Sequence, residues 1–112
     1  MRIAIPISDG VLAQHFGHCE QFVLIDVNTA TKAVLTSSQE AAPPHEPGLL
    51  PRLFRERGVG VVITGGMGAR ARALFQEAGI EVVTGAESRP FESVVQDYLA
   101  GNLATVANSC DH

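Results

Sequence analysis

The sequence has few basic residues and no long apolar run. Its 112 residues include 8 Lys and Arg against 12 Asp and Glu, so the net charge is −4 at pH 7. This balance argues against nucleic acid and anionic membranes as partners, since both favour a basic protein face. No apolar run approaches the roughly 18 residues that a membrane span needs. Residues 1–6 lack the apolar region and cleavage site of a signal peptide, so we expect a cytoplasmic protein.

Cysteine is also scarce, and two cysteines do not make a secreted disulfide framework. A disulfide between Cys19 and Cys110 stays open, but a reducing compartment favours free thiols or metal ligands. The sequence shows no Walker loop, no Cys-x-x-Cys motif and no evident Ser-His-Asp triad. Asp9 follows the first apolar run, but Asp26 falls near the far end of the second, which argues against a metal-dependent nuclease. We therefore expect that the protein is not an enzyme.

The remaining features predict one globular α/β domain. A length of 112 residues and a hydrophobic content of 46% suit a single domain with a core of its own. Apolar runs and turn residues predict a domain over residues 1–101 and a flexible tail over 102–112. The predicted strands cover residues 2–7, 21–27, 32–39, 59–64 and 80–84. The predicted helices cover residues 48–57, 69–78 and, from 89 or 90, up to 100.

This order of elements predicts a mixed five-stranded sheet covered by helices. Three strands meander, and the alternating strands and helices that follow add parallel strands through right-handed crossovers. We expect the strand order 3-2-1-4-5, with strand 2 antiparallel, in a three-layer α/β/α arrangement of the ribonuclease H-like type. Strands 1 and 4 then form a topological switch point, where open α/β sheets bind ligands beyond the strand ends. The loops at that crevice are residues 8–19 and 65–68.

The loop over residues 8–19 is rich in potential metal ligands. It holds two of the four histidines and one of the two cysteines, namely His15, His18 and Cys19. Imidazole and thiolate are ligands for zinc, iron and metal clusters. Phe16 predicts an apolar anchor that would pin His15 in place. The alternative interpretation is a buried Phe16 with incidental surface histidines, and a Cys19 that is a small core residue.

Three further groups are candidates for the same site. Gly65-Gly66-Met67-Gly68 lies between a strand and a helix, where glycines admit close approach and the helix N-terminus favours an anion. A tight turn that needs positive φ is the alternative explanation. His45 precedes the first helix and would reach the crevice only if its loop folds over the sheet edge. Cys110 and His112 end the chain and would join the site only if the tail closes on it.

Five short motifs, in order along nearly the whole chain, carry a family resemblance: Ile3 to Pro6, His15 to Gly17, His45 to Gly48, Gly65 to Gly68 and Tyr98 to Gly101. Together they resemble the dinitrogenase iron–molybdenum cofactor biosynthesis domain family, which includes small nitrogen-fixation proteins that carry this cofactor and its precursors. The resemblance implies the ribonuclease H-like fold and binding of an iron–sulfur-type cluster or its biosynthetic precursor. It also implies that His15 is a ligand, whereas His18 and Cys19 fall outside the motif.

Three functions are consistent with these observations. The first is a non-catalytic carrier of an iron–sulfur or iron–molybdenum-type cluster, with metal-cluster biosynthesis or acceptor proteins as partners. The backbone of Gly65 to Gly68 would then face the anionic cluster. The second is a mononuclear zinc site from His15, His18, Cys19 and a terminal Cys110 or His112. The third is a metal-free module that binds a partner or a small anion.

Overall fold

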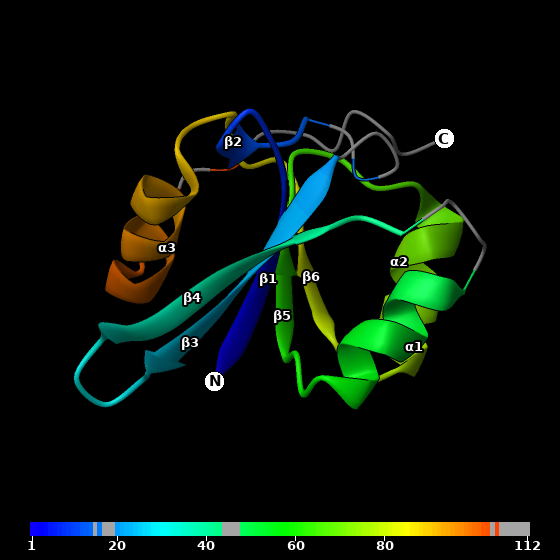
Figure 1. Cartoon of the computed structure of the whole chain (residues 1–112), viewed down its shortest axis with the longest axis horizontal. Helices are drawn as coiled ribbons and strands as arrows, with labels where there is room; N and C mark the ends of the chain where they lie inside the picture. The colour runs from blue at the N-terminus through cyan, green and yellow to red at the C-terminus, as the bar shows by residue number, and fades with distance from the viewer. Residues whose placement is uncertain (15, 17–19, 44–47, 104, 106–112) are drawn as a thin grey trace.

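The computed structural model describes residues 1–14, 16, 20–43, 48–103 and 105 (Figure 1). They form a mixed α/β domain in which three helices cover a six-stranded sheet. The strands are β1 (Arg2–Ser8), β2 (Val11–Leu12), β3 (Gln21–Asn28), β4 (Ala33–Ala41), β5 (Val61–Ile63) and β6 (Glu81–Val83). The helices are α1 (Leu49–Glu56), α2 (Ala69–Glu77) and α3 (Phe91–Ala100). The helices lie within two residues of their predicted bounds.

The strand order along the sheet is β4-β3-β1-β5-β6, with β2 beside β1. β3 runs antiparallel to both β1 and β4, whereas β1, β5 and β6 are parallel to one another. The predicted strand order is therefore confirmed for β4, β3, β1, β5 and β6, including the antiparallel second strand and the third strand at the edge. The predicted strand number is wrong, because the sheet has six strands and not five.

The additional strand, β2, belongs to a tight hairpin inside the segment that was expected to be an irregular loop. Asp9 and Gly10 have φ values of 54° and 80°, and they join β1 to β2 in a two-residue turn. Turns of this kind need positive φ at both central residues, which is why Asp-Gly favours them. Ile7 pairs with Leu12 on the two sides of the turn. The opening loop is thus ordered by its own hairpin as far as Leu12.

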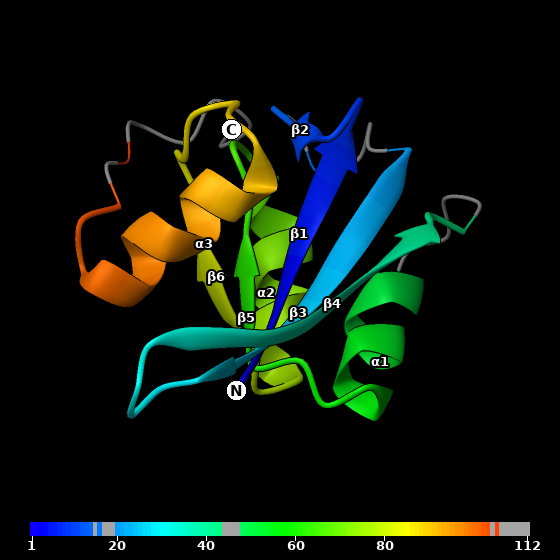
Figure 2. The same cartoon turned by 60° about the vertical axis from the view of Figure 1, so that its left-hand side comes forward.

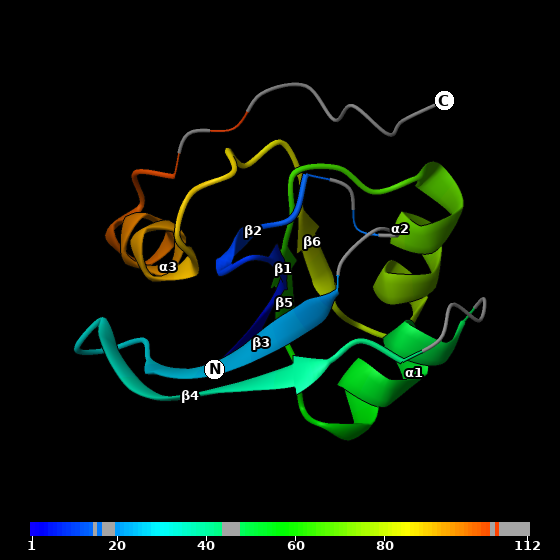
Figure 3. The same cartoon turned by 45° about the horizontal axis from the view of Figure 1, so that its top comes forward.

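The helices cover both faces of the sheet (Figures 1 and 3). On one face α3 packs Phe91, Val94 and Val95 against apolar residues of β1, β3 and β5. On the other face α1 and α2 supply Phe54 and Phe75 to a second apolar cluster. Burying each such aromatic side chain stabilises the fold by about 1.5–3 kcal/mol. Helices on both faces agree with a three-layer arrangement, while the ribonuclease H-like type stays a prediction.

The end of the chain is described only in part. Leu103 packs against the cluster under α3, and Thr105 forms an isolated bridge with Ala86. Residues 104 and 106–112 lie outside the described part, so the predicted flexible tail over 102–112 stays a prediction. Among the described residues no helix is long and apolar enough to cross a membrane.

Candidate functional site

The β1–β2 hairpin folds over the carboxyl end of β5. Ile7 pairs with Gln21 of β3 on one side and with Leu12 of β2 on the other, so β2 lies on the β5 side of β1. Ala13 continues this ladder: its N–H donates to Pro6 O at 2.8 Å, and its carbonyl accepts from the Gly65 N–H at 3.3 Å. The chain itself therefore occupies the crevice between β1 and β5. A ligand at the switch point would contact the outer surface of this loop, not the strand ends.

The opening loop is fastened to the glycine turn through Phe16. The Phe16 N–H donates to Gly66 O at 2.8 Å, and the Phe16 ring meets the Phe75 ring edge-on, with centroids 5.3 Å apart. The Phe75 ring in turn lies 5.8 Å from that of Phe54. The predicted contact between residues 8–19 and 65–68 is confirmed, and so is the inward packing of Phe16.

The glycine turn owes part of its composition to this contact. A Cβ at Gly65 would lie 2.6 Å from Gln14 O, so the two backbones pass too close for any side chain. Met67 is buried in the cluster under α1 and α2, and its side chain belongs to the core. Gly68 is the N-cap of α2, whose first turn contains no acidic residue. The N–H groups of that first turn are the ones that helix geometry leaves for an anion.

A third loop, residues 84–90, completes this edge, and sequence reasoning missed it. Gly85 N–H donates to Gly65 O at 2.7 Å, and Leu12 N–H donates to Arg89 O at 2.9 Å. The Ser88 hydroxyl lies 3.0 Å from Leu12 O and donates to it. The signal that could have found this loop is topological, because it follows β6, a parallel strand that ends at the same edge. Hydrogen bonds thus hold all three loops together, and Figure 3 looks onto this edge.

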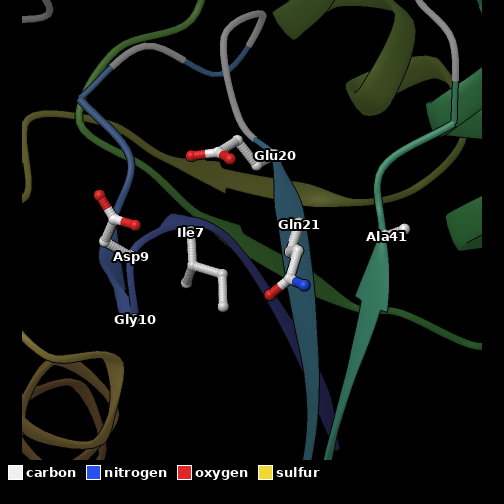
Figure 4. Close-up of a pocket in the computed structure, with 6 residues that line it drawn as sticks. All are labelled: Ile7, Asp9, Gly10, Glu20, Gln21 and Ala41. Carbon is white, nitrogen blue, oxygen red and sulfur yellow. The ribbon is translucent and has the colours of Figure 1, made fainter.

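A pocket of about 290 Å³ opens on the other side of β1, next to β3 and β4 (Figure 4). Two carboxylates line it, from Asp9 of the hairpin turn and from Glu20 before β3. In Figure 4 the Glu20 side chain extends towards the side of the pocket where Asp9 lies. Two negative charges make this pocket unsuitable for an anionic ligand. The rest of its lining is Ile7, Gly10, Gln21 and Ala41.

The predicted metal ligands fall outside the described residues. These are His15, His18, Cys19, His45, Cys110 and His112, and their roles stay predictions. Within the described chain no group of three or more His, Cys, Asp and Glu side chains is placed to hold a metal ion. The structure therefore describes only the segments next to the predicted ligands. These segments are the β1–β2 hairpin, Phe16, the glycine turn and the start of α2.

The clearest charge interaction lies at the opposite end of the sheet and is structural. Arg2 Nε donates to Asp26 Oδ1 at 2.7 Å, and the Thr36 hydroxyl donates to Asp26 Oδ2 at 3.0 Å. The hydrogen bond from Arg2 lowers the pKa of Asp26, and the same contact raises the pKa of Arg2. This group ties β1, β3 and β4 together away from the loops.

The fold is that of a small mixed α/β protein. Its opening loop, which is rich in potential metal ligands, covers the switch point at the carboxyl edge of the sheet. The chain belongs to the dinitrogenase iron–molybdenum cofactor family, whose model matches residues 1–101. This confirms the family that the five sequence motifs predicted.

Three relatives illustrate the match. The crystal structure of the protein PH0822 is 32% identical, has a TM-score of 0.85 and aligns over 94% of each chain. The apo form of the orange protein from Desulfovibrio gigas is 29% identical, with a TM-score of 0.69 over 96% of this chain and 93% of that one. The uncharacterized protein MJ0580 of Methanocaldococcus jannaschii is 26% identical in an alignment of 106 residues that covers 92% of this chain and 89% of that protein.

Proposed function

We propose that the protein is a non-catalytic carrier of an iron–sulfur-type cluster or of a precursor related to the iron–molybdenum cofactor. The observation that carries the proposal is the family match over residues 1–101, combined with the contact between Phe16 and Gly66. That contact fastens Phe16, the central residue of the His-Phe-Gly motif, to the glycine turn. The orange protein is described in an apo form, which suits a family whose members bind a removable group.

The chemistry of the edge suits an anionic cargo. Iron–sulfur clusters are bulky and negatively charged, and their sulfides accept hydrogen bonds from backbone N–H groups. The N-terminus of α2 offers such groups and a partial positive charge, and its first turn carries no acid. The acidic pocket beside Asp9 and Glu20 would repel the same cargo, so we place the cargo on the α2 side of the hairpin.

The expected ligands suit a cargo that must be released. His15 is the first ligand, since it lies in the family motif, and His18, Cys19, His45, Cys110 and His112 are further candidates. A few histidine and cysteine ligands bind a cluster less tightly than a closed set of four cysteines would. The carrier would have a ribonuclease H-like fold. In the cytoplasm it would receive its cluster from a biosynthetic protein and pass it to an acceptor protein.

A comparison of two histidine variants tests this proposal. The purified protein, His15→Ala and His18→Ala are each reconstituted with iron and sulfide without oxygen, and bound iron and sulfide are measured per chain. We expect the His15→Ala protein to lose most of its cluster and the His18→Ala protein to keep more, because only His15 lies in the family motif. Equal cluster uptake by all three proteins would contradict the role of His15.

Zinc analysis of the same samples separates the alternatives. Stoichiometric zinc without sulfide, retained through purification in air, would support a mononuclear zinc site instead. A protein that binds neither metal nor cluster under any of these conditions would support a metal-free interaction module.

A further inference from the structure

The two residues on either side of His15 in the chain are fastened to two different loops. Phe16, which follows His15, donates its N–H to Gly66 O in the glycine turn. Gln14, which precedes it, contacts Ser88 in the loop before α3, with 3.1 Å between Gln14 Oε1 and the Ser88 hydroxyl oxygen. The candidate ligand His15 thus has a held residue on each side of it in the chain. Figure 2 shows the domain from a second side, with the loops after β1, β5 and β6 at one edge.

The backbone of Gln14 lies against the glycine turn. The Ala13 carbonyl accepts from the Gly65 N–H at 3.3 Å, and a Cβ at Gly65 would lie 2.6 Å from Gln14 O. Gly65 belongs to the turn that leads from β5 into α2, whereas the pocket lined by Asp9 and Glu20 opens next to β3 and β4. Gln14 is therefore on the side of the hairpin where we place the cargo, away from the two carboxylates.

Ser88 is well placed to hold the Gln14 side chain, because its own loop is bonded to the opening loop. The N–H of the buried Leu12 donates to Arg89 O at 2.9 Å, and the Ser88 hydroxyl donates to Leu12 O at 3.0 Å. A hydroxyl has a single proton, so Ser88 shares it between Leu12 O and Gln14 Oε1. The oxygen of the Gln14 amide is thus the end that is held.

The nitrogen of the same amide has two N–H donors and no hydrogen-bond partner among the described residues. Gln14 is exposed, so these donors are open to a bound group. Hydrogen bonds to the sulfides are among the interactions by which proteins hold and tune iron–sulfur clusters. A side-chain amide would stabilise an anionic cargo in this way without adding a bond to the metal, which suits a cargo that must be released.

We propose that Gln14 donates its side-chain N–H groups to the anionic cargo and that Ser88 is the positioning residue that fixes this amide. The inference rests on the proposed carrier function and adds a cargo contact other than a metal ligand to it. It also gives a role to the loop before α3, which contains neither histidine nor cysteine.

Release of a reconstituted cluster to EDTA tests the contact. The parent protein, Gln14→Glu and Gln96→Glu are loaded with iron and sulfide without oxygen, and the loss of cluster absorption is followed. Gln14→Glu keeps an oxygen that accepts from Ser88, but it replaces both N–H donors by a second, negatively charged oxygen. The control Gln96→Glu adds the same charge at an exposed position of α3. We expect release at least tenfold faster in Gln14→Glu and unchanged in Gln96→Glu.

Variants of Ser88 test its positioning role in the same assay. Ser88→Ala should release the cluster roughly threefold faster, as expected for the loss of one hydrogen bond, and Ser88→Thr should restore the parent rate because it keeps the hydroxyl. If Ser88 acts through Gln14, Ser88→Ala should cause no further acceleration in a Gln14→Ala protein. A purely structural loosening of the loop would instead make the two effects multiply, and that result would overturn the positioning role.

The two possible failures are distinguishable. A parent protein that takes up neither iron nor sulfide would contradict the carrier function and, with it, this inference. A loaded parent protein that releases its cluster at the same rate as Gln14→Glu would overturn the inference alone. Because Gln14 is exposed and the substitution is isosteric, we expect Gln14→Glu to fold, which circular dichroism checks.

Discussion

The backbone N–H of Phe16 donates a hydrogen bond to the carbonyl oxygen of Gly66 across 2.8 Å. This bond joins the loop after β1 to the turn after β5, which are the two segments that flank the switch point of the sheet. Because the β1–β2 hairpin also covers the end of β5, the crevice is filled by the chain. The candidate site is therefore a surface built from the loops, and its geometry depends on how firmly they are held together.

The close approach of Gly65 to Gln14 predicts a large effect of a small substitution. The added Cβ in Gly65→Ala would lie 2.6 Å from Gln14 O, so the two loops would have to separate. We expect a loss of about 1–3 kcal/mol in the free energy of unfolding, as for other overpacked sites. Urea denaturation measures it. Gly60→Ala is the matched control, since its nearest neighbour would be 4.0 Å away, and it should change stability by less than about 0.5 kcal/mol.

The Phe16 ring should be a main source of stability for the opening loop. Phe16→Ala removes the edge-on contact with Phe75 and leaves a cavity, so we expect a loss of about 3–5 kcal/mol in urea denaturation. Phe16→Leu should recover a large part of this loss, because it refills the cavity. A comparable loss from Gln76→Ala, at an exposed position of α2, would show that the assay does not report on packing.

The ion pair of Asp26 predicts a pH-dependent effect on stability. Arg2 lowers the pKa of Asp26 in the folded protein, so the contact stabilises the fold when Asp26 is ionised in both states. This stabilisation is present above the pKa of the unfolded carboxyl, near 4, and disappears as the pH falls through the lower folded pKa. Asp26→Asn should therefore lower the melting temperature at pH 7 and have progressively less effect in more acidic buffers.

Thermal melts of Asp26→Asn between neutral and strongly acidic pH measure this change. Glu77→Gln, at an exposed carboxylate of α2, is the matched control and should lower the melting temperature little at any pH. A melting-temperature difference for Asp26→Asn that stays constant down to strongly acidic pH would contradict the assigned cause.

The Ser88 hydroxyl should help to hold the opening loop against the loop before α3. It donates to Leu12 O at 3.0 Å, and Ser88→Ala would leave that carbonyl with one hydrogen bond fewer. We expect a loss of about 0.5–1.5 kcal/mol, the usual contribution of such a bond. Ser93→Ala, at an exposed position of α3, should stay within about 0.5 kcal/mol of the parent protein.

The sequence predicted the path of the chain through the sheet because that path depends on strong local signals. Apolar runs identified β1, β3 and β5, and the right-handed crossover rule placed β5 beside β1. β2 was missed because a strand of two residues has no alternation to detect. The Asp9-Gly10 dipeptide was the available signal, since Asp-Gly favours a two-residue hairpin turn.

The site was predicted less completely than the fold. The contact between the opening loop and the glycine turn followed from strand order, and it is confirmed. The reason for Gly65 could not be predicted, because it depends on how closely Gln14 passes in space. The acidic pocket was missed for a similar cause: no local pattern links Asp9 to Glu20, and it is the pairing of β1 with β3 that brings them to one pocket.

Iron and acid-labile sulfide analysis of the protein, isolated without oxygen, tests the central claim most directly. A cluster carrier should contain both elements in similar amounts, show the absorption of an iron–sulfur chromophore and lose it to a chelator while staying folded. Protein that contains neither iron nor sulfide, both as isolated and after reconstitution, would contradict the claim.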